Sequence, residues 1–189
     1  MNLSSYKPPI NKVLILFIVS GLLFKLGVAN SRHKIIVNGN ERFVQHVSSC
    51  LDLLAKKYPE AYKFSQKYIG IIARNRRSGM IAWSNPPIYN MSDTTAYYSL
   101  TWCASSIAHD AYHSYLYQKF KPKGSQRTPD RYWADFKAER LAIQYQTRVA
   151  RKIGADQHEL DYLGTLDGKH ADVNGDGTIT SKDLADRDW

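Results

Sequence analysis

Residues 96–120 read AYYSLTWCASSIAHDAYHSYLYQKF and predict the long central helix on which the rest of the fold is built. Apolar and small side chains recur along this stretch at helical spacing, so one face is suited to a core. That stripe consists of Leu100, Cys103, Ile107, Ala111 and Ser114. Capping residues at positions 92–95 precede the stretch, and Pro122 and Gly124 follow it. We therefore expect one continuous helix across residues 96–120.

The sequence on either side of this helix predicts an α+β fold that is mainly helical. Strand-like stretches come first, at residues 33–37, 68–73 and 80–83. A basic turn joins the last two, which predicts a hairpin and hence a small antiparallel sheet ahead of the central helix. Pro86 and Pro87 confine the residues after them to an edge strand or a loop. Helical spacing, capping or a first-turn proline predicts further helices from Glu41 onward and at residues 60–67, 132–153 and 156–166.

The N-terminal residues 1–29 predict export. Lys7 and Lys12 form a positive head, and residues 13–24 (VLILFIVSGLLF) are twelve residues without a charge. A helix of that length rises only ~18 Å, well short of the ~30 Å hydrocarbon core of a bilayer. It suits the apolar region of a secretory signal, and residues 27–29 (GVA) are small enough for cleavage. We expect a secreted, periplasmic or extracellular protein, anchored in the membrane only if this signal remains uncleaved.

The chain of 189 residues carries a formal net charge of +9. Its basic residues are scattered along the sequence instead of forming one run. Scattered charges of this kind are usually a solvated surface, so we expect no specific nucleic-acid partner.

The two cysteines, Cys50 and Cys103, are candidates for a disulfide because an even pair in an exported protein is usually oxidised. The bridge would tie an N-terminal helix to the start of the central helix. The alternative is a pair of small buried thiols, since Cys50 shares a helical face with Val47 and Leu54.

Residues 172–183 read DVNGDGTITSKD and match a calcium-binding loop of the EF-hand type. Oxygen donors fill the ligand positions, with the carbonyl of Thr178 at position 7: the predicted calcium ligands are Asp172, Asn174, Asp176, Thr178 and Asp183. Gly177 stands where the loop needs a sharp turn, and Asp183 replaces the usual bidentate glutamate, which predicts weaker affinity. We expect a structural calcium ion in a C-terminal module at residues 167–189.

The calcium loop also resembles one repeat of a dockerin module, which contains two such repeats. Only one is present in this chain, at residues 172–183. The resemblance therefore does not imply binding to cohesin.

Residues 109–113 read HDAYH and predict a second metal site. Histidines at positions i and i+4 lie on one face of a helix, so His109 and His113 can reach a single ion. Zinc needs a third protein ligand and keeps one position for water. The best candidate is Glu139, which lies in apolar company on the next long helix. The alternative is a structural histidine cluster without metal.

The HDAYH pattern resembles the zincin metallopeptidases, whose HExxH helix supplies two zinc ligands and a glutamate base. Their gluzincin branch takes its third ligand from a glutamate on a following helix, which implies Glu139 here and a zincin-like domain at residues 33–166. The departure is Asp110, whose carboxylate stops about one bond short of a glutamate. Asp110 would act as the base through an extra water or would orient His109. The catalytic candidates are thus Asp110 and Glu139, with Tyr112 and His158 in reserve.

These features predict an exported zinc-dependent hydrolase, either a peptidase or a cell-wall amide hydrolase, with zinc and calcium as cofactors. One alternative resembles phospholipase A2, because His109-Asp110 lies on a helix that Cys103 would tie by a disulfide. That alternative leaves His113 and Glu139 without a role. The other alternative is a non-enzymatic, calcium-stabilised binding or scaffold module.

Overall fold

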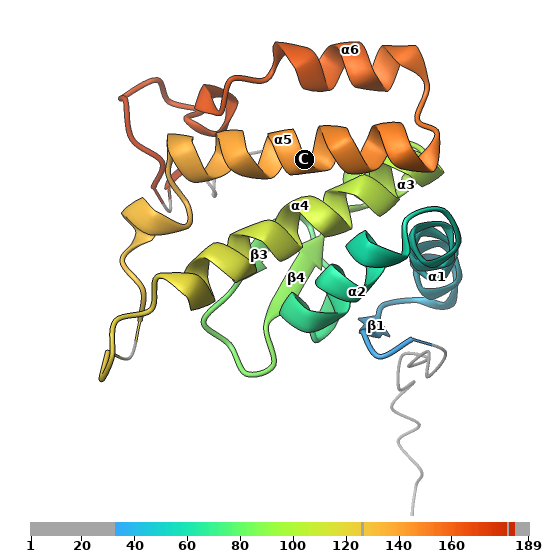
Figure 1. The fold of residues 1–189 in the computed structure, drawn as a ribbon, viewed down its shortest axis with the longest axis horizontal. Coiled ribbons are helices and arrows are strands. Elements are labelled where there is room, and N and C mark those ends of the chain that lie inside the picture. The colour runs from blue at the N-terminus through green and yellow to red at the C-terminus, as the bar shows by residue number, and fades with distance from the viewer. Residues whose placement is uncertain (1–32, 126, 181, 184–189) are drawn as a thin grey trace, which may run out of the picture.

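The computed structural model describes residues 33–125, 127–180 and 182–183 (Figure 1). The elements follow in the order β1 (Ile36–Asn38), α1 (Glu41–Lys57), α2 (Pro59–Tyr68), β2 (Ile71–Arg74), β3 (Gly79–Ile81), β4 (Ile88–Met91), α3 (Asp93–Tyr97), α4 (Leu100–Lys119), η1 (Asp130–Tyr132), α5 (Phe136–Ile153), α6 (Gln157–Thr165) and η2 (Lys169–Ala171). The fold is α+β and mainly helical, as the sequence predicts. The predicted secretory signal at residues 1–29 lies outside the described part. Among the described helices, none is long and apolar enough to cross a bilayer.

The sheet is mixed, so the prediction of an antiparallel sheet is wrong. Its strand order is β1-β2-β4-β3, with β1, β2 and β4 parallel and only β3 antiparallel to its neighbour. Helices α1 and α2 form the long crossover that a parallel β1–β2 pair requires. The predicted hairpin between residues 68–73 and 80–83 does not form, because β4 lies between β2 and β3. The prediction that the residues after Pro86 and Pro87 form an edge strand or a loop is wrong, because β4 lies between β2 and β3. Both prolines precede β4, so they remove no amide from its ladder.

The central helix begins later than predicted. Residues 93–97 form the short helix α3, and α4 begins at Leu100 after a break at Tyr98 and Ser99. The backbone of Ser99 is extended, and its side chain accepts a hydrogen bond from the Trp102 amide, which caps the new helix. Figure 1 shows α4 running through the middle of the molecule, with α1 and α2 on one side and α5 and α6 on the other. Most of its residues are buried.

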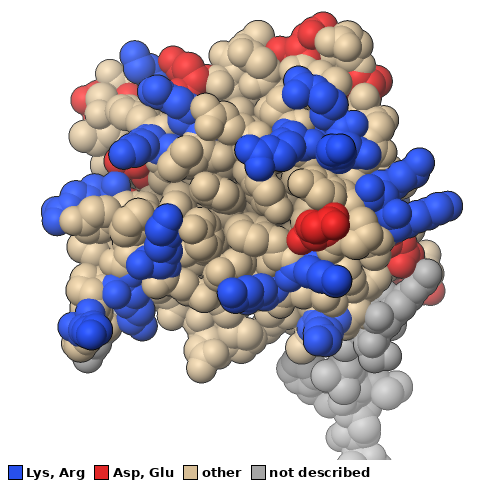
Figure 2. Space-filling model, viewed as in Figure 1, with Lys and Arg blue, Asp and Glu red and all other residues tan. Residues whose placement is uncertain are grey.

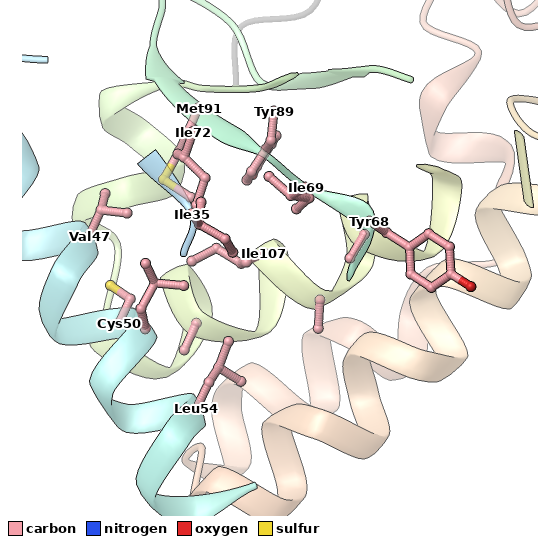
Figure 3. Packing of buried hydrophobic residues seen from close by; sticks show 14 of the residues in the cluster. Ile35, Val47, Cys50, Leu54, Tyr68, Ile69, Ile72, Tyr89, Met91 and Ile107 are labelled. Carbon is pink, nitrogen blue, oxygen red and sulfur yellow. The ribbon is translucent and has the colours of Figure 1, made fainter. Parts of the chain in front are cut away.

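The hydrophobic core lies where the sheet, α1 and α4 meet (Figure 3). Ile72 and Tyr89 come from the sheet, Leu54 from α1 and Ile107 from α4, and each is buried almost completely. These contacts fix the depth and the rotation of α4. The residues of α4 that face away from this core are therefore held in a fixed direction.

Helices α5 and α6 complete the described fold. Helix α5 is shorter than predicted because it begins at Phe136, where Asp135 caps it by accepting a hydrogen bond from the Ala138 amide. It ends at Gly154, which has a left-handed φ of 90°. Helix α6 begins after Asp156, whose side chain caps the Glu159 amide. The start and the end of α5 and the start of α6 are thus set by neighbouring residues in the sequence.

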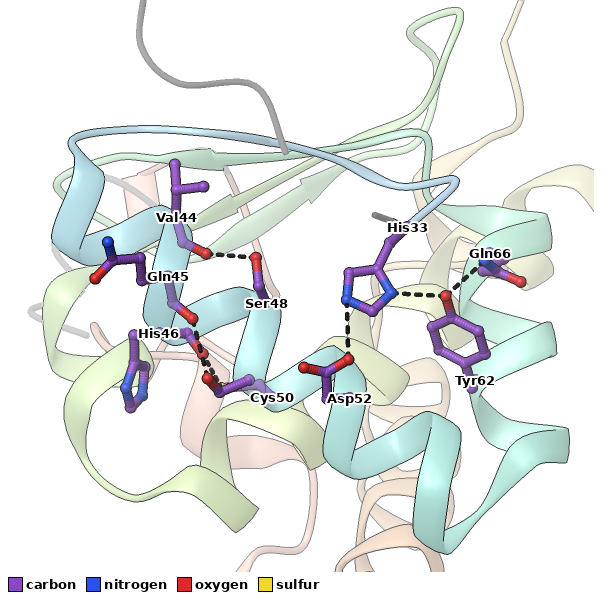
Figure 4. A network of polar contacts seen from close by, with 10 residues as sticks. His33, Val44, Gln45, His46, Ser48, Cys50, Asp52, Tyr62 and Gln66 are labelled. Atoms are coloured by element: carbon purple, nitrogen blue, oxygen red, sulfur yellow. Dashed lines mark hydrogen bonds and ion pairs between the residues drawn. The ribbon is translucent and has the colours of Figure 1, made fainter. Parts of the chain in front are cut away.

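A polar network holds the start of the described chain against α1 and α2 (Figure 4). The Nδ1 atom of His33 lies 2.8 Å from the Tyr62 hydroxyl, and its Nε2 atom lies 3.5 Å from the Asp52 carboxylate. Gln66 donates a further hydrogen bond to the same hydroxyl. The residues before β1 are therefore anchored by side chains as well as by the sheet.

The disulfide predicted between Cys50 and Cys103 is present and joins α1 to α4, with its Cα atoms 6.0 Å apart. Both residues are fully buried in the core. The bridge therefore links the N-terminal half of the fold directly to the helix that carries the two histidines.

Replacing both cysteines by alanine should lower the free energy of unfolding by roughly 3–4 kcal/mol, because the bridge closes a long loop in the unfolded chain. The sequence separation of the two residues is 53. Urea unfolding of the wild type and of the double variant measures the difference. A reductant should destabilise the wild type and leave the double variant unchanged. Equal stability of the two proteins would contradict the structural role of the bridge.

Candidate metal centre

Three side chains from two helices converge inside the protein. His109 and His113 come from α4 and Glu139 comes from the first turn of α5; we call these three residues the triad. The two Nε2 atoms lie 3.1 Å apart, and each faces one oxygen of the Glu139 carboxylate, at 3.4 Å for His109 and 3.6 Å for His113. The structure therefore brings together the three zinc ligands expected from the sequence.

The spacing of the triad suits one small divalent ion. Ligand atoms at about 2.0–2.1 Å from a tetrahedral zinc lie roughly 3.3 Å from one another. The two Nε2 atoms lie 3.1 Å apart, and each lies 3.4 or 3.6 Å from a different oxygen of Glu139. With one ligand atom taken from each residue, the three atoms lie within 4.8 Å of one another, so the triad is near this spacing. Two imidazole nitrogens and one carboxylate oxygen are also a donor set that zinc accepts in catalytic sites. The residues present therefore fit a zinc ion.

The second nitrogen of each imidazole is in a different environment. The Nδ1 atom of His113 donates to the backbone carbonyl of Trp133 at 2.6 Å, so Nε2 is the nitrogen that faces the other two residues of the triad and can bind a metal. Such a contact orients a ligating histidine and raises its basicity. The Nδ1 atom of His109 is buried and has no hydrogen-bond partner among the described residues. His113 is thus held more firmly than His109.

The triad shifts the pKa values of its own members. Burial alone would lower the pKa of His113, but the Glu139 carboxylate, with smaller effects from Asp110 and the Trp133 carbonyl, raises that pKa to about 9. Burial would raise the pKa of Glu139, but His113 and His109 hold it well below its usual range. Without metal, the site is therefore a buried imidazolium–carboxylate pair. A divalent ion would take the place of the proton.

A cleft with a volume of about 1020 Å³ gives access to the triad. The edge strand contributes to the lining through residues 78–80, and the C-terminal segment contributes through Leu166 and residues 179–180. Within the described part of the chain, β3 pairs with β4 on one side only. β3 is thus an edge strand of the described sheet, and its first residues lie at the cleft.

Asp110 lines the same cleft as the triad and is buried. Tyr89 on β4 lies close to it: burial raises the pKa of Tyr89 well above its usual value, and the negative charge of Asp110 raises it further. Ser106, one helical turn before Asp110, accepts a hydrogen bond from the Tyr89 hydroxyl at 3.3 Å. The catalytic candidate Asp110 therefore lines the same cleft as the triad, and it lies next to Tyr89 of the sheet.

The two reserve candidates lie in different places. His158 on α6 is exposed and lines the cleft. The Tyr112 ring instead packs against Phe64, Tyr115 and Tyr145, and Tyr112 is not among the residues that line the cleft. The structure thus removes Tyr112 from the candidate site.

Sequence reasoning missed three residues of the site. His170 lines the cleft from η2, Tyr89 lines it from β4, and Trp133 provides a backbone carbonyl to His113. Tyr89 had a signal, because it follows two prolines in an alternating apolar stretch. A backbone carbonyl has none, since every residue type supplies one.

A second cluster of potential ligand atoms is formed by His46, Cys50 and Cys103. Both cysteines are bonded to each other, so their sulfurs are not thiolates and cannot act as ordinary metal ligands. We assign this cluster to the disulfide and not to a metal.

The calcium-type loop is folded around its own side chains. Asp172 accepts hydrogen bonds from the amides of Asp176 and Gly177, Asn174 accepts from Asp176, and Asp176 accepts from Thr178. Gly177 has a left-handed φ of 84°, which the sharp turn at position 6 requires.

The last acidic residue of the loop faces backbone amides as well. The carboxylate of Asp183 accepts hydrogen bonds from Val173 and Thr180. Within the described residues, the carboxylates of Asp172, Asp176 and Asp183 do not form a group of three ligand atoms within 4.8 Å. The structure therefore shows the turn of the loop but does not gather the predicted ligands.

On the face shown in Figure 2, Lys and Arg lie in several separate groups. A smaller cavity of about 650 Å³ involves α5 and α6 and is lined by Arg140, Arg148 and Arg151, but it does not include the triad.

Without metal, the protein should lose stability as the pH rises from 6.5 to about 9. The pKa of His113 is raised from 6.5, so its contribution is complete below pH 6.5 and is lost as the pH passes through about 9. The lowered pKa of Glu139 contributes above pH 4.5. Urea unfolding of chelator-treated protein should show a loss on the order of 3 kcal/mol at most. The Glu139→Gln variant should lose much of this dependence, and an unchanged pH dependence in that variant would contradict the pairing.

No protein-family model, curated protein or solved structure matches this chain. Its function is therefore inferred from the triad, the cleft and the C-terminal loop.

Proposed function

We propose that this protein is an exported zinc-dependent hydrolase that cleaves amide bonds in peptides. The observation that supports it most is the convergence of His109, His113 and Glu139 at distances that suit one zinc ion, inside an accessible cleft. The layout also resembles the zincins in the order of its parts: a sheet with an antiparallel edge strand, the histidine helix, and the glutamate helix.

Each side chain of the site has a distinct role in this proposal. The triad would hold zinc, which lowers the pKa of a bound water and polarises a substrate carbonyl. Asp110 accepts the proton of the attacking water and passes it to the leaving amine. Its place in the same cleft as the triad, next to His109 in the chain, supports this role. The Trp133 carbonyl keeps His113 in the tautomer that binds metal through Nε2.

A peptide is the substrate that the cleft favours. β3 is an edge strand whose first residues line the cleft, and an extended peptide would add to such an edge as a further strand. This contact would hold the scissile bond beside the triad. Neither a lipid nor a glycan chain has the backbone groups to pair with a strand edge in this way.

The phospholipase A2-like alternative has less support. It needs a working pair of His109 and Asp110, but Nε2 of His109 faces Glu139 and His113. Its Nδ1 atom makes no hydrogen bond with any described residue, Asp110 included. The non-enzymatic alternative leaves both the triad and the cleft above it without a role.

Export is supported by two independent features. Residues 13–24 have the length and the composition of a secretory signal. The buried disulfide between Cys50 and Cys103 is typical of proteins that fold in an oxidising compartment. A secreted, periplasmic or extracellular location is the one that we propose.

Calcium is proposed as a structural ion of the C-terminal segment. This segment packs on the start of α5: Gly168 has a φ of 92°, and a Cβ atom there would lie 2.6 Å from the Phe136 carbonyl oxygen. Ile179 and Thr180 of the calcium-type loop line the cleft. Calcium would draw Asp172, Asp176 and Asp183 together and so fix this part of the wall.

The purified protein should bind one zinc ion and cleave quenched peptide substrates, and a zinc chelator should abolish the cleavage. His113→Ala and Glu139→Ala each remove a ligand, so each should lower the zinc affinity at least tenfold and the activity at least 100-fold. Elemental analysis and peptide hydrolysis on the same samples measure both effects. Full activity of either variant would contradict the proposal.

The matched control is Asp110→Asn, which keeps the shape of a cleft residue that is not a ligand. It should bind zinc as the wild type does and lose roughly 100-fold in kcat, because a proton acceptor contributes about 10²- to 10⁴-fold. Loss of zinc from this variant would instead show that Asp110 acts by supporting the ligands.

Calcium should raise the stability of the protein by about 2.7 kcal/mol when its concentration is ~100-fold above Kd. Asp176→Asn removes a predicted ligand charge and should reduce this gain, measured as the rise of Tm with calcium. Asp161→Asn, an exposed change on α6 outside the loop, should leave the gain unaltered. An equal response of both variants would contradict a calcium site at residues 172–183.

A further inference from the structure

Three aromatic side chains form an exposed cluster that the proposed chemistry does not use. The rings of Tyr98 and Trp102 lie 5.4 Å apart, and those of Trp102 and Tyr162 lie 5.6 Å apart. Tyr98 is 54% exposed and Tyr162 is 50% exposed. We call these three residues the aromatic notch. Exposed aromatic groups of this kind usually mark a binding surface.

The aromatic notch belongs to the same cleft as the triad, because all three of its residues line that cleft. Trp102 precedes His109 by seven residues on α4, which places the two side chains on nearly the same face of the helix. Seven residues of helix span about 10.5 Å. An extended peptide covers that distance with about three residues.

The notch is held in place by a buried carboxylate. Glu159 of α6 is 2% exposed and accepts hydrogen bonds from the hydroxyls of Ser99 and Thr101 at the start of α4. Tyr162 follows Glu159 by three residues and so lies on the same side of α6. The contact of Glu159 with α4 therefore keeps the Tyr162 ring against Trp102. A site that is fixed in advance loses little entropy when a ligand binds.

We infer that the aromatic notch binds an aromatic or bulky apolar side chain of the substrate, about three residues from the scissile bond. The inference rests on the proposed function and adds a substrate preference to it. The open edge of β3 would carry the backbone of the same peptide past the triad. The notch would then favour substrates that carry an aromatic or bulky apolar residue at that distance from the cleaved bond.

The shape of the notch favours a side chain over a sugar ring. The planes of Tyr98 and Trp102 meet at 58°, and those of Trp102 and Tyr162 meet at 49°. At 5.4 and 5.6 Å the rings contact one another, so a ligand side chain would pack on the angled surface that they form together. Aromatic groups prefer such tilted contacts with one another. We therefore assign the notch to peptide recognition.

A peptide library tests the inference without knowledge of the natural substrate. Cleavage of the library by the zinc-loaded wild type, read by mass spectrometry, should show Phe, Tyr, Trp or Leu enriched at the third position on one side of the cut. Two peptides that differ only there, Phe against Ala, should then differ about tenfold in kcat/KM. Trp102→Ala and Tyr162→Ala should each reduce this ratio to about one.

Phe120→Ala is the matched control, because Phe120 is 41% exposed and does not line the cleft. It should keep the tenfold ratio. Tyr162 is half-exposed, so its variant tests the notch even if Trp102→Ala fails to fold.

A wild type that cleaves no peptide would overturn the proposed function. Peptide cleavage with no preference at that position, or a ratio that survives both variants, would overturn the notch alone. Cleavage only of amides attached to sugar chains, lost in Trp102→Ala, would assign the notch to a glycan instead.

Discussion

The contact between α4 and α5 holds two imidazoles and a carboxylate against one another inside the protein, and the rest of the site depends on it. Burying any one of these groups alone would be unfavourable, because a charged or polar side chain loses its water there. Together they compensate one another, with His113 and Glu139 as an ion pair when no metal is bound. Both helices carry buried alanines, such as Ala108 and Ala142, which leave room for this polar cluster. The core on the far side of α4 and the disulfide at its start keep the helix from turning.

The remaining parts of the cleft are organised around these two helices. The edge strand β3 and the residue before it line the cleft through residues 78–80, and the segment after α6 lines it through Leu166, Ile179 and Thr180. The carboxylate of Glu159 holds α6 against the start of α4. Residues of both helices line the cleft, so this contact also helps to shape it. Glu159 also positions the aromatic notch. The two histidines of the triad and the aromatic residue Trp102 thus lie on neighbouring stretches of α4.

Local patterns were sufficient to predict most helices and the members of the triad. The i, i+4 spacing of His109 and His113 needs only helical geometry, and Glu139 was identified by its apolar neighbours on the next helix. Strand order was not predictable, because the insertion of β4 between β2 and β3 is a contact between distant residues. The helix break at Ser99 was not predictable for a similar reason. The Ser99 hydroxyl accepts a hydrogen bond from the Trp102 amide and donates one to Glu159, which is distant in the sequence. The Trp133 carbonyl and the C-terminal wall of the cleft likewise have no signature in side-chain type.

X-ray absorption spectroscopy of the zinc-loaded protein tests the central claim most directly, because it reports the atoms bound to the ion. The account predicts one zinc per chain, four-coordinate, with two imidazole nitrogens and oxygen ligands at about 2.0–2.1 Å. His113→Ala should remove one imidazole from that spectrum. A zinc ion without imidazole ligands, or no stoichiometric zinc at all, would contradict the assignment of His109, His113 and Glu139 as a metal centre.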